Sequence, residues 1–172
     1  MREYTQASFT DEKEVALMSK AFVLFAVLGL ALAVGCQPSV DLDAETQAVQ
    51  KVLESYVASI ETEDMDLYST NMARDPAMVN FGGFGEPIVG WDGLKAVMEG
   101  QNEALSDTRI TVSDMAIHVS GDGQHAWATC LWDLNAVMGE NPVELPIRCT
   151  WILDKHEGRW VIVHFHKSMA AG

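Results

Sequence analysis

Two histidines near the end of the last predicted strand have a spacing that could serve metal binding. His164 and His166 are separated by one residue, so in a β-strand they share a face, with their Cα atoms about 6–7 Å apart. Histidines at that distance can ligate a metal ion. No further Cys, His or Asp stands at a motif spacing, so we predict no metal site and no cofactor. We expect the pair to make structural hydrogen bonds.

The strand that carries these histidines, residues 159–168, is rich in Val, Ile, Phe and Trp, which is typical of a β-strand. Side chains alternate between the two faces of a strand. Strict alternation predicts one face formed by Trp160, Ile162, His164, His166 and Ser168. It predicts a second face formed by Val161, Val163, Phe165 and Lys167. Both faces contain apolar residues, so we expect both to be covered.

Asp133 is a second candidate for chemistry, because it follows Trp132 in a strand that is otherwise apolar. A carboxylate that points into a pocket, within reach of a histidine or Lys167, could act as a general base. A carboxylate at the edge of a hairpin would instead belong to the solvated surface. The residues alone leave both interpretations open.

Residues 18–36 have the pattern of an export signal. The run Ala21–Val34 is apolar and 14 residues long, which is short for a membrane span and typical of a signal sequence. The run is followed by the small residue Gly35 and then Cys36, which resembles a bacterial lipoprotein signal. We therefore expect lipidation of Cys36 and anchoring in the cell envelope, at the outer membrane or the periplasmic face. An ordinary secretory signal or an anchor helix is the alternative. Residues 1–17 are predicted to be an over-extended gene start or a disordered tail, and residues 37–43 a tether.

The 172-residue chain has a formal net charge of −14. So strong a negative charge argues against nucleic acids and anionic lipid surfaces as partners. The length that remains after the signal suits one domain with a full core. Cys130 and Cys149 fall in adjacent predicted strands, where we expect buried free thiols. A disulfide, which an oxidising compartment would permit, is the alternative.

Hydrophobic periodicity predicts three helices followed by a series of long strands. The helices are expected at residues 43–62, with Asp43 in the capped start, at 63–74 and at 91–105. The strands are expected at residues 77–81, 109–119, 124–137, 143–154 and 159–168. This order is typical of an α+β fold in which three N-terminal helices cover the concave face of a strongly bent, cone-shaped antiparallel sheet. Such a sheet encloses a pocket.

This order of elements resembles the nuclear-transport-factor-two-like superfamily, which includes SnoaL-like and ketosteroid isomerase-like proteins. The most specific match is Gly158–Ser168, which is similar to the closing strand of the association domain of calcium/calmodulin-dependent protein kinase two. Ile117–Asp122 is similar to a turn of the same domain, and Gly90–Gly93 is similar to the start of a helix common in the superfamily. The likeness covers residues 44–169 and implies a SnoaL-like domain over that range.

The ketosteroid isomerase-like branch implies three functional positions. Tyr56, eight residues before Asp64, matches the tyrosine that donates to the oxyanion. Asn80 stands where the catalytic carboxylate is expected, and an amide cannot accept a proton at ordinary pH. Pro146 and Cys149 lie near the place of a second carboxylic acid, and neither can replace it. The resemblance therefore implies a related pocket that lacks the catalytic carboxylates.

The kinase association domain implies a pocket lined by arginines that could hold an anion. Trp151 stands at one of those positions in this chain, and a second lies near Leu131. Lys167 partly keeps a third. The pocket implied here is therefore less cationic and more aromatic, which suits a small, partly apolar ligand better than a polyanion.

We therefore predict an exported SnoaL-like domain that binds a small, largely apolar molecule in its cone and forms a homodimer through the open face of its sheet. The predicted lining residues are Tyr56, Asn80, Trp91, Asp133, Trp151 and Lys167. One alternative is an isomerase-, dehydratase- or cyclase-like enzyme that uses Asp133 or a histidine as base together with Tyr56. Another alternative is an oligomerisation module, because this fold hosts many functions.

Overall fold

The computed structural model describes residues 39–169, and the predicted signal segment with Cys36 lies outside them. The helices are α2 (Leu42–Glu61), α3 (Met65–Asn71) and α4 (Gly90–Ala104). The strands are β1 (Val79–Asn80), β2 (Ile88–Val89), β3 (Leu105–Val119), β4 (His125–Met138), β5 (Asn141–His156) and β6 (Arg159–Ser168). The predicted α+β order is confirmed, with bounds that differ by a few residues. None of the helices described is both long and apolar enough to cross a membrane.

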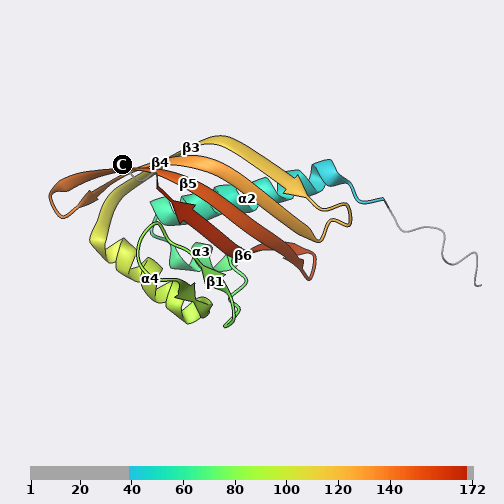
Figure 1. Cartoon of the computed structure of the whole chain (residues 1–172), viewed down its shortest axis with the longest axis horizontal. Coiled ribbons are helices and arrows are strands. Elements are labelled where there is room, and N and C mark those ends of the chain that lie inside the picture. The colour runs from blue at the N-terminus through green and yellow to red at the C-terminus, as the bar shows by residue number, and fades with distance from the viewer. Residues whose placement is uncertain (1–38, 170–172) are drawn as a thin grey trace, which may run out of the picture. The chain divides into compact units, whose positions relative to one another are not determined.

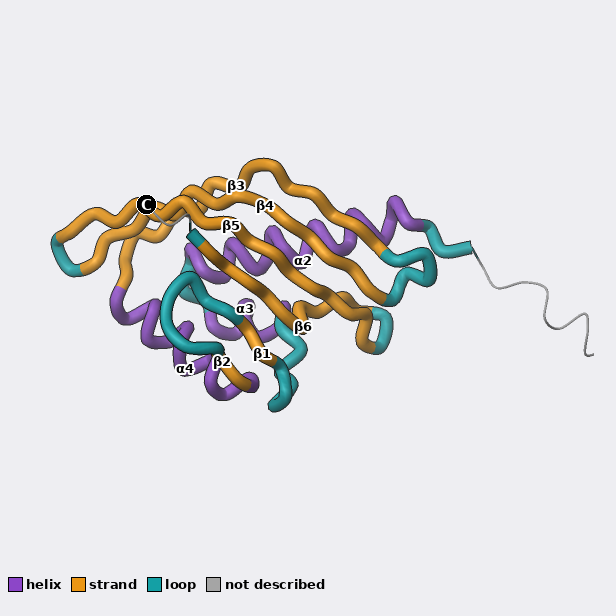
Figure 2. The backbone as a smooth tube through the Cα atoms, in the orientation of Figure 1, coloured by secondary structure: helices purple, strands orange, loops and turns teal. Residues whose placement is uncertain are grey.

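The four long strands form one antiparallel sheet in the order β3-β4-β5-β6. The helices lie on one side of it, which we call the inner face (Figures 1 and 2). In the two central strands the inner face includes Ala126, Ala128, Cys130, Trp132, Leu134, Ala136, Ile147, Cys149, Trp151 and Leu153, all buried. The alternating residues form the outer face, which includes Trp127, Thr129, Leu131, Asp133, Arg148, Thr150 and Ile152.

The sheet curves because β3 is bulged twice. Its pairing with β4 shifts register between Ser106 and Arg109 and between Ser113 and Ala116. Asp107 and Asp114 have φ angles of 54° and 52° at these places, a region that aspartate tolerates better than most residues. Bulges bend a strand and increase its twist, and Figure 1 shows the sheet curving over α2.

Helix α2 is amphipathic, with apolar residues at three- and four-residue spacing. Its buried side includes Val49, Leu53, Tyr56 and Ile60. The N-cap is Asp41, whose side chain accepts a hydrogen bond of 3.0 Å from the amide of Ala44. The predicted capping residue Asp43 is wrong, because it already lies in the first turn of the helix, where an acidic side chain still interacts favourably with the helix dipole.

Helix α4 begins at a glycine because the chain turns there with a positive φ. Gly90 has a φ of 72°, and its amide donates a hydrogen bond of 2.8 Å to the carbonyl oxygen of Met78. A Cβ at this position would come within 2.9 Å of the carbonyl oxygen of Pro76. Only glycine fits without strain, and it fixes where the next residue, Trp91, enters the interior.

The free edge of β6 is covered by chain segments on either side of β1. Met72–Ala73 and Phe81 pair with β6 in parallel. The Phe81 amide donates to the carbonyl of Phe165, and the Lys167 amide donates to the carbonyl of Phe81, each at 2.9 Å. The neighbouring residue Asn80 also contacts β6, since its Oδ1 accepts a hydrogen bond of 2.8 Å from the Phe165 amide. The edge is thereby protected, and the backbone around Lys167 is fixed.

A bulge at Val163 corrects the predicted assignment of faces in β6. The β5 residues Ile152 and Leu153 are consecutive, but the β6 residues opposite them are separated by Val163. One extra residue inverts the alternation beyond it. The inner face of β6 therefore consists of Trp160, Ile162, Phe165 and Lys167. The prediction that Trp160 and Ile162 share a face with the two histidines is wrong for this reason.

Candidate ligand-binding site

Aromatic rings fill the space between α2 and the inner face. Tyr56 lies at the centre, with its ring centroid 5.3 Å from that of Tyr68, 6.2 Å from Trp132, and 6.3 Å from Trp151 and Phe165. The two tryptophans are 5.5 Å apart. All five side chains are buried, and their separations are those of aromatic pairs in direct contact. We call these five residues the aromatic cluster.

Lys167 brings a positively charged group to the aromatic cluster. Its Nζ donates a hydrogen bond of 3.1 Å to the hydroxyl of Tyr56. It also lies 4.5 Å from the ring centroid of Trp132, 5.0 Å from Phe165 and 5.2 Å from Tyr56. Ring faces attract a cation at these distances. The fold thus brings Tyr56 and Lys167 together, although they are 111 residues apart in the chain.

The environment of this pair changes the proton affinities of both residues. Burial lowers the pKa of Lys167 to about 8, although the nearby Cys149 and Cys130 thiols oppose the shift. Burial also raises the pKa of Tyr56 well above its ordinary value, with the neighbouring Tyr68 hydroxyl as a second cause. At neutral pH, Tyr56 is therefore a protonated phenol, and a fraction of Lys167 is neutral amine.

Two thiols continue the row from Lys167 across the sheet. Cys149 pairs with Lys167 in the β5–β6 register, and Cys130 pairs with Cys149 in the β4–β5 register. Both cysteines are buried and free, which confirms the expectation of buried free thiols. The adjacent Cys130 thiol and burial together raise the pKa of Cys149, so this thiol is protonated at neutral pH.

Four buried polar atoms in residues 39–169 have no hydrogen-bond partner. They are the Tyr68 hydroxyl, Asn80 Nδ2, Trp132 Nε1 and Trp151 Nε1. Three of them belong to the aromatic cluster. Buried polar groups are normally paired, because an unpaired one costs about 1–3 kcal/mol. Unpaired donors among apolar walls are groups that acceptor atoms of a ligand could satisfy.

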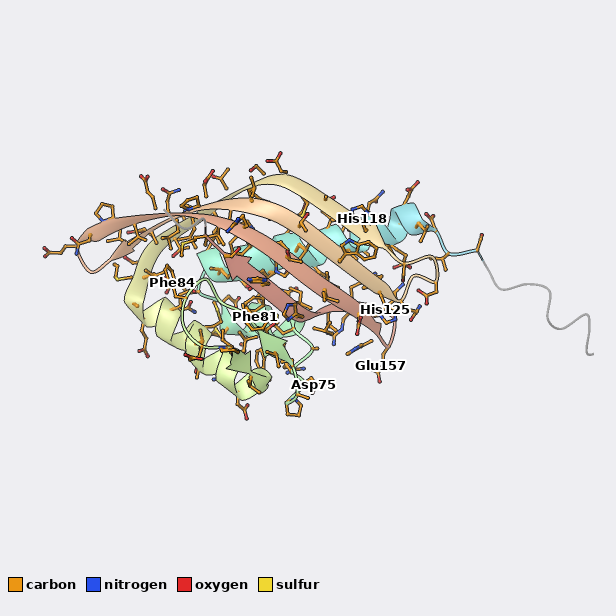
Figure 3. All side chains as sticks on the ribbon, in the orientation of Figure 1. Asp75, Phe81, Phe84, His118, His125 and Glu157 are labelled. Carbon is orange, nitrogen blue, oxygen red and sulfur yellow. The ribbon has the colours of Figure 1, made fainter. Side chains whose placement is uncertain are left out.

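An open depression of about 550 Å³ lies beside Lys167, between the loop after β1 and the end of β6. Its lining consists of Phe81, Gly82, Gly83, His166, Lys167, Ser168 and Met169. Figure 3 labels Phe81 at this position. The volume is typical of a small-molecule site. Lys167 joins the two parts of the site, because it lines the depression and also contacts the aromatic cluster.

Of the six predicted lining residues, only Lys167 lines the depression. Tyr56 and Trp151 belong to the aromatic cluster, and Trp91 and Asn80 contact it. Trp91 is half-buried and stacks on Tyr68, with centroids 6.4 Å apart. Asn80 is fully buried, but its Oδ1 is already used by the backbone of β6. Only its Nδ2 is left to meet a ligand.

Asp133 does not line the site, and this prediction is wrong. Its side chain is exposed on the outer face, whereas its neighbours Trp132 and Leu134 point inward. Its partners in the sheet are Thr111 and Pro146, which are exposed as well. Alternation along β4 therefore places the carboxylate across the sheet from the aromatic cluster.

His164 and His166 also lie on the outer face. Nδ1 of His164 is 2.6 Å from the carbonyl oxygen of Val79, and the two imidazole rings pack edge-on against Phe81 at centroid distances of 5.7 and 5.5 Å. These contacts within the chain give the two histidines a structural role. Within the described part of the chain, no group of three or more His, Cys, Asp or Glu could hold a metal ion.

Trp132 and Tyr68 are site residues that the sequence prediction did not include. Every second residue of β4 is apolar and buried, so the alternation that places Asp133 outside also places Trp132 inside. That signal was present in the sequence. Helical spacing places Tyr68 on the buried side of α3, but spacing alone does not distinguish a tyrosine of the site from one of the core.

Comparison with known proteins supports the fold. A family model described as the SnoaL-like domain matches residues 49–172. A nuclear transport factor 2 (NTF2-like) superfamily protein from Salmonella enterica is 23% identical, with a TM-score of 0.69 over 76% of this chain and 94% of that chain. A proposed dehydratase of the NTF2-like family from Streptomyces avermitilis is 13% identical, with a TM-score of 0.68 over 76% of this chain and 99% of that chain.

A proposed calcium/calmodulin-dependent protein kinase II association domain from Xanthomonas campestris is 14% identical, with a TM-score of 0.62 over 71% of this chain and 85% of that chain. No curated protein matches the sequence significantly. At these identities the solved structures share the fold with this chain, and a shared fold does not establish a shared activity. Because the family model covers most of the sequence, the chain belongs to the SnoaL-like family of NTF2-like folds.

Proposed function

We propose that this domain binds a small, largely apolar molecule, which approaches through the depression beside Lys167 and contacts the aromatic cluster. The observation that carries the proposal is the pair of unpaired indole N–H groups of Trp132 and Trp151. Apolar walls with a few fixed polar groups are typical of small-molecule sites. A ligand with an apolar body and one or two acceptor atoms would pack against the rings and accept hydrogen bonds from the indoles.

Titration of the full chain with benzyl alcohol, indole and cyclohexanol tests this proposal. Tryptophan fluorescence and thermal unfolding serve as readouts. A compound that binds should raise the melting temperature, with about 2.7 kcal/mol of added stability at 100 times its Kd. No shift with any compound would contradict the proposal.

Two tryptophans of the same sheet give a matched pair of variants. Trp151→Phe removes an inner-face indole N–H and should weaken the binding of benzyl alcohol. Trp127→Phe removes an indole on the outer face, where the residue is 49% exposed, and should leave the affinity unchanged. Equal effects of the two substitutions would show that binding occurs elsewhere.

The alternative enzyme with Asp133 or a histidine as base has no support in the described residues. Asp133, His164 and His166 lie on the opposite face of the sheet from Tyr56. His166 borders the depression, but its ring packs against Phe81. Solved relatives include a proposed dehydratase and a proposed aromatic ring hydroxylase, but their likeness to this chain extends to the fold only. Any chemistry in this site would depend on Lys167 and Tyr56.

The outer face favours a second role, in which two copies of the chain associate as a homodimer. Trp127, Leu131 and Ile152 are 49%, 43% and 43% exposed on that face, and exposed apolar patches mark interaction surfaces. Light scattering of the full chain should give the mass of a dimer, and Leu131→Glu should shift it toward the monomer without changing ligand affinity. A monomer at all concentrations would contradict the dimer, and larger rings would favour the oligomerisation module.

We also propose export with lipid attachment at Cys36, on the basis of the sequence pattern alone. Metabolic labelling with a fatty acid in a bacterial host should modify the chain, and Cys36→Ser should abolish the label. Labelling that persists in Cys36→Ser, or its absence in both proteins, would contradict this part of the proposal.

A further inference from the structure

We propose that Lys167 is a reactive amine that captures small aromatic aldehydes or ketones as reversible imines at the inner end of the depression. The inference rests on the proposed function, because it names the class of molecule that the same site would hold and adds a covalent step.

Lys167 is half-buried and borders the depression. Its Nζ contacts Tyr56 and the faces of three aromatic rings. In the described residues Lys95 and Lys155 are instead ion-paired with Glu99 and Glu45. An aromatic carbonyl compound in the depression would meet an amine whose position is fixed and whose surroundings favour a ring.

Among the titratable groups around Nζ, only the two cysteines favour the ammonium form, and burial outweighs their effect. The titratable groups are Tyr56 from α2, Tyr68 from α3, Cys130 from β4 and Cys149 from β5, which are two phenols and two thiols. Burial accordingly lowers the pKa of Lys167 to about 8. A desolvated lysine of this kind is a better nucleophile near neutral pH than a surface lysine, because more of it is neutral amine.

The reaction needs no oxidant or reductant. The lone pair of neutral Nζ adds to the carbonyl carbon, and the carbonyl oxygen takes up a proton. The protonated Tyr56 hydroxyl, 3.1 Å from Nζ, is placed to donate it and to recover a proton from the nitrogen. The resulting carbinolamine loses water as the C=N bond forms, and addition of water reverses the step. Tyr56 and Lys167 thus act as proton donor and nucleophile.

Reductive trapping of the full chain tests the inference. The protein is incubated with benzaldehyde and sodium cyanoborohydride, which reduces the imine to a stable secondary amine, and is then analysed by intact mass and peptide mapping. We expect one benzyl group per chain, on Lys167, with a rate that rises as the pH passes through about 8. Label distributed over the exposed lysines in proportion to their accessibility would overturn the inference.

Matched variants separate this inference from the proposed function. Lys167→Arg keeps the positive charge, and Lys167→Met keeps an unbranched side chain of similar length. Either should abolish the specific label, whereas the surface variant Lys95→Arg should not. Benzyl alcohol has no carbonyl group, so its binding reports the proposed function alone. If benzyl alcohol binds and Lys167 is not labelled, only the imine fails. If neither benzyl alcohol nor benzaldehyde stabilises the protein, the proposed function fails as well.

Discussion

The inner and outer faces of the sheet are built from the same strands, yet their polar groups are used in opposite ways. On the inner face, the indole nitrogens of Trp132 and Trp151 have no partner. On the outer face, His164 is hydrogen-bonded to backbone, and Trp127 stacks on His118 with centroids 5.1 Å apart. Both faces carry tryptophan, so residue type does not mark the site. What marks it is that its buried polar atoms remain unpaired.

The largest expected difference between the faces concerns stability. Trp151→Ala should lower the free energy of unfolding by about 3–5 kcal/mol, because it leaves a cavity in the core. Trp127→Ala should cost about 1 kcal/mol or less, since half of the side chain is already in water. Denaturant unfolding of both variants measures the difference. Similar losses would mean that the outer face is also part of a core, as in a tightly associated dimer.

The polar contact that holds β6 gives the next largest effect. Asn80→Ala removes the acceptor of the Phe165 amide and should destabilise the fold by about 2–3 kcal/mol, because a buried donor loses its partner. Asn135→Ala, on the exposed side of β4, is the control and should change stability by about 0.5 kcal/mol at most. Hydrogen exchange at the Phe165 amide should increase in Asn80→Ala, and an unchanged rate would contradict this role.

The lowered pKa of Lys167 predicts a pH dependence of stability that is opposite in sign to the one expected from His125 on the outer face. Its pKa is about 8 in the folded chain and about 10.4 when unfolded. Between these pH values the unfolded chain binds more protons than the folded chain. The loss of stability caused by burying the Lys167 ammonium is therefore complete below pH 8 and decreases as the pH rises toward 10. The stability difference between Lys167→Met and the natural chain should therefore change by about 1–2 kcal/mol from pH 7 to pH 10. A constant difference would contradict the lowered pKa.

The smallest effect on stability is expected at the exposed end of β4. Nδ1 of His125 donates a hydrogen bond of 2.8 Å to Oδ1 of Asp154, which raises the pKa of His125. Stability from this pair is present below about pH 6.5 and is lost as the pH rises through the raised value. Asp154→Asn should move the pKa back toward its ordinary value in an NMR titration, without changing ligand affinity. Figure 3 shows His125 away from Phe81, which lines the depression.

The helices, the long strands and the α+β architecture could be predicted because they depend on local periodicity and turn residues. The contact between Tyr56 and Lys167 could be anticipated only through the resemblance to a known family, since no local pattern relates residues 111 positions apart. The outward position of Asp133 follows from the alternation of buried and exposed residues in β4, whereas the residue type alone is compatible with either face.

The faces of β6 could not be predicted, for a physical reason. Valine is an ordinary strand residue, and nothing in its type shows that Val163 is the extra residue of a bulge. The bulge depends on pairing with β5 and on the segments that cover the strand edge, which are tertiary features. The unpaired indole groups are also invisible in the sequence, because pairing depends on the complete packing of the interior.

The extra residue at Val163 also bears on how this chain is compared with its relatives. An alignment without a gap opposite Val163 would match Lys167 with an outward-facing position of any homologue whose closing strand is regular. Residue roles transferred through that alignment would be displaced by one residue, so the role of Lys167 would be assigned to His166. Superposition on Cys149, the cross-strand neighbour of Lys167, avoids the error.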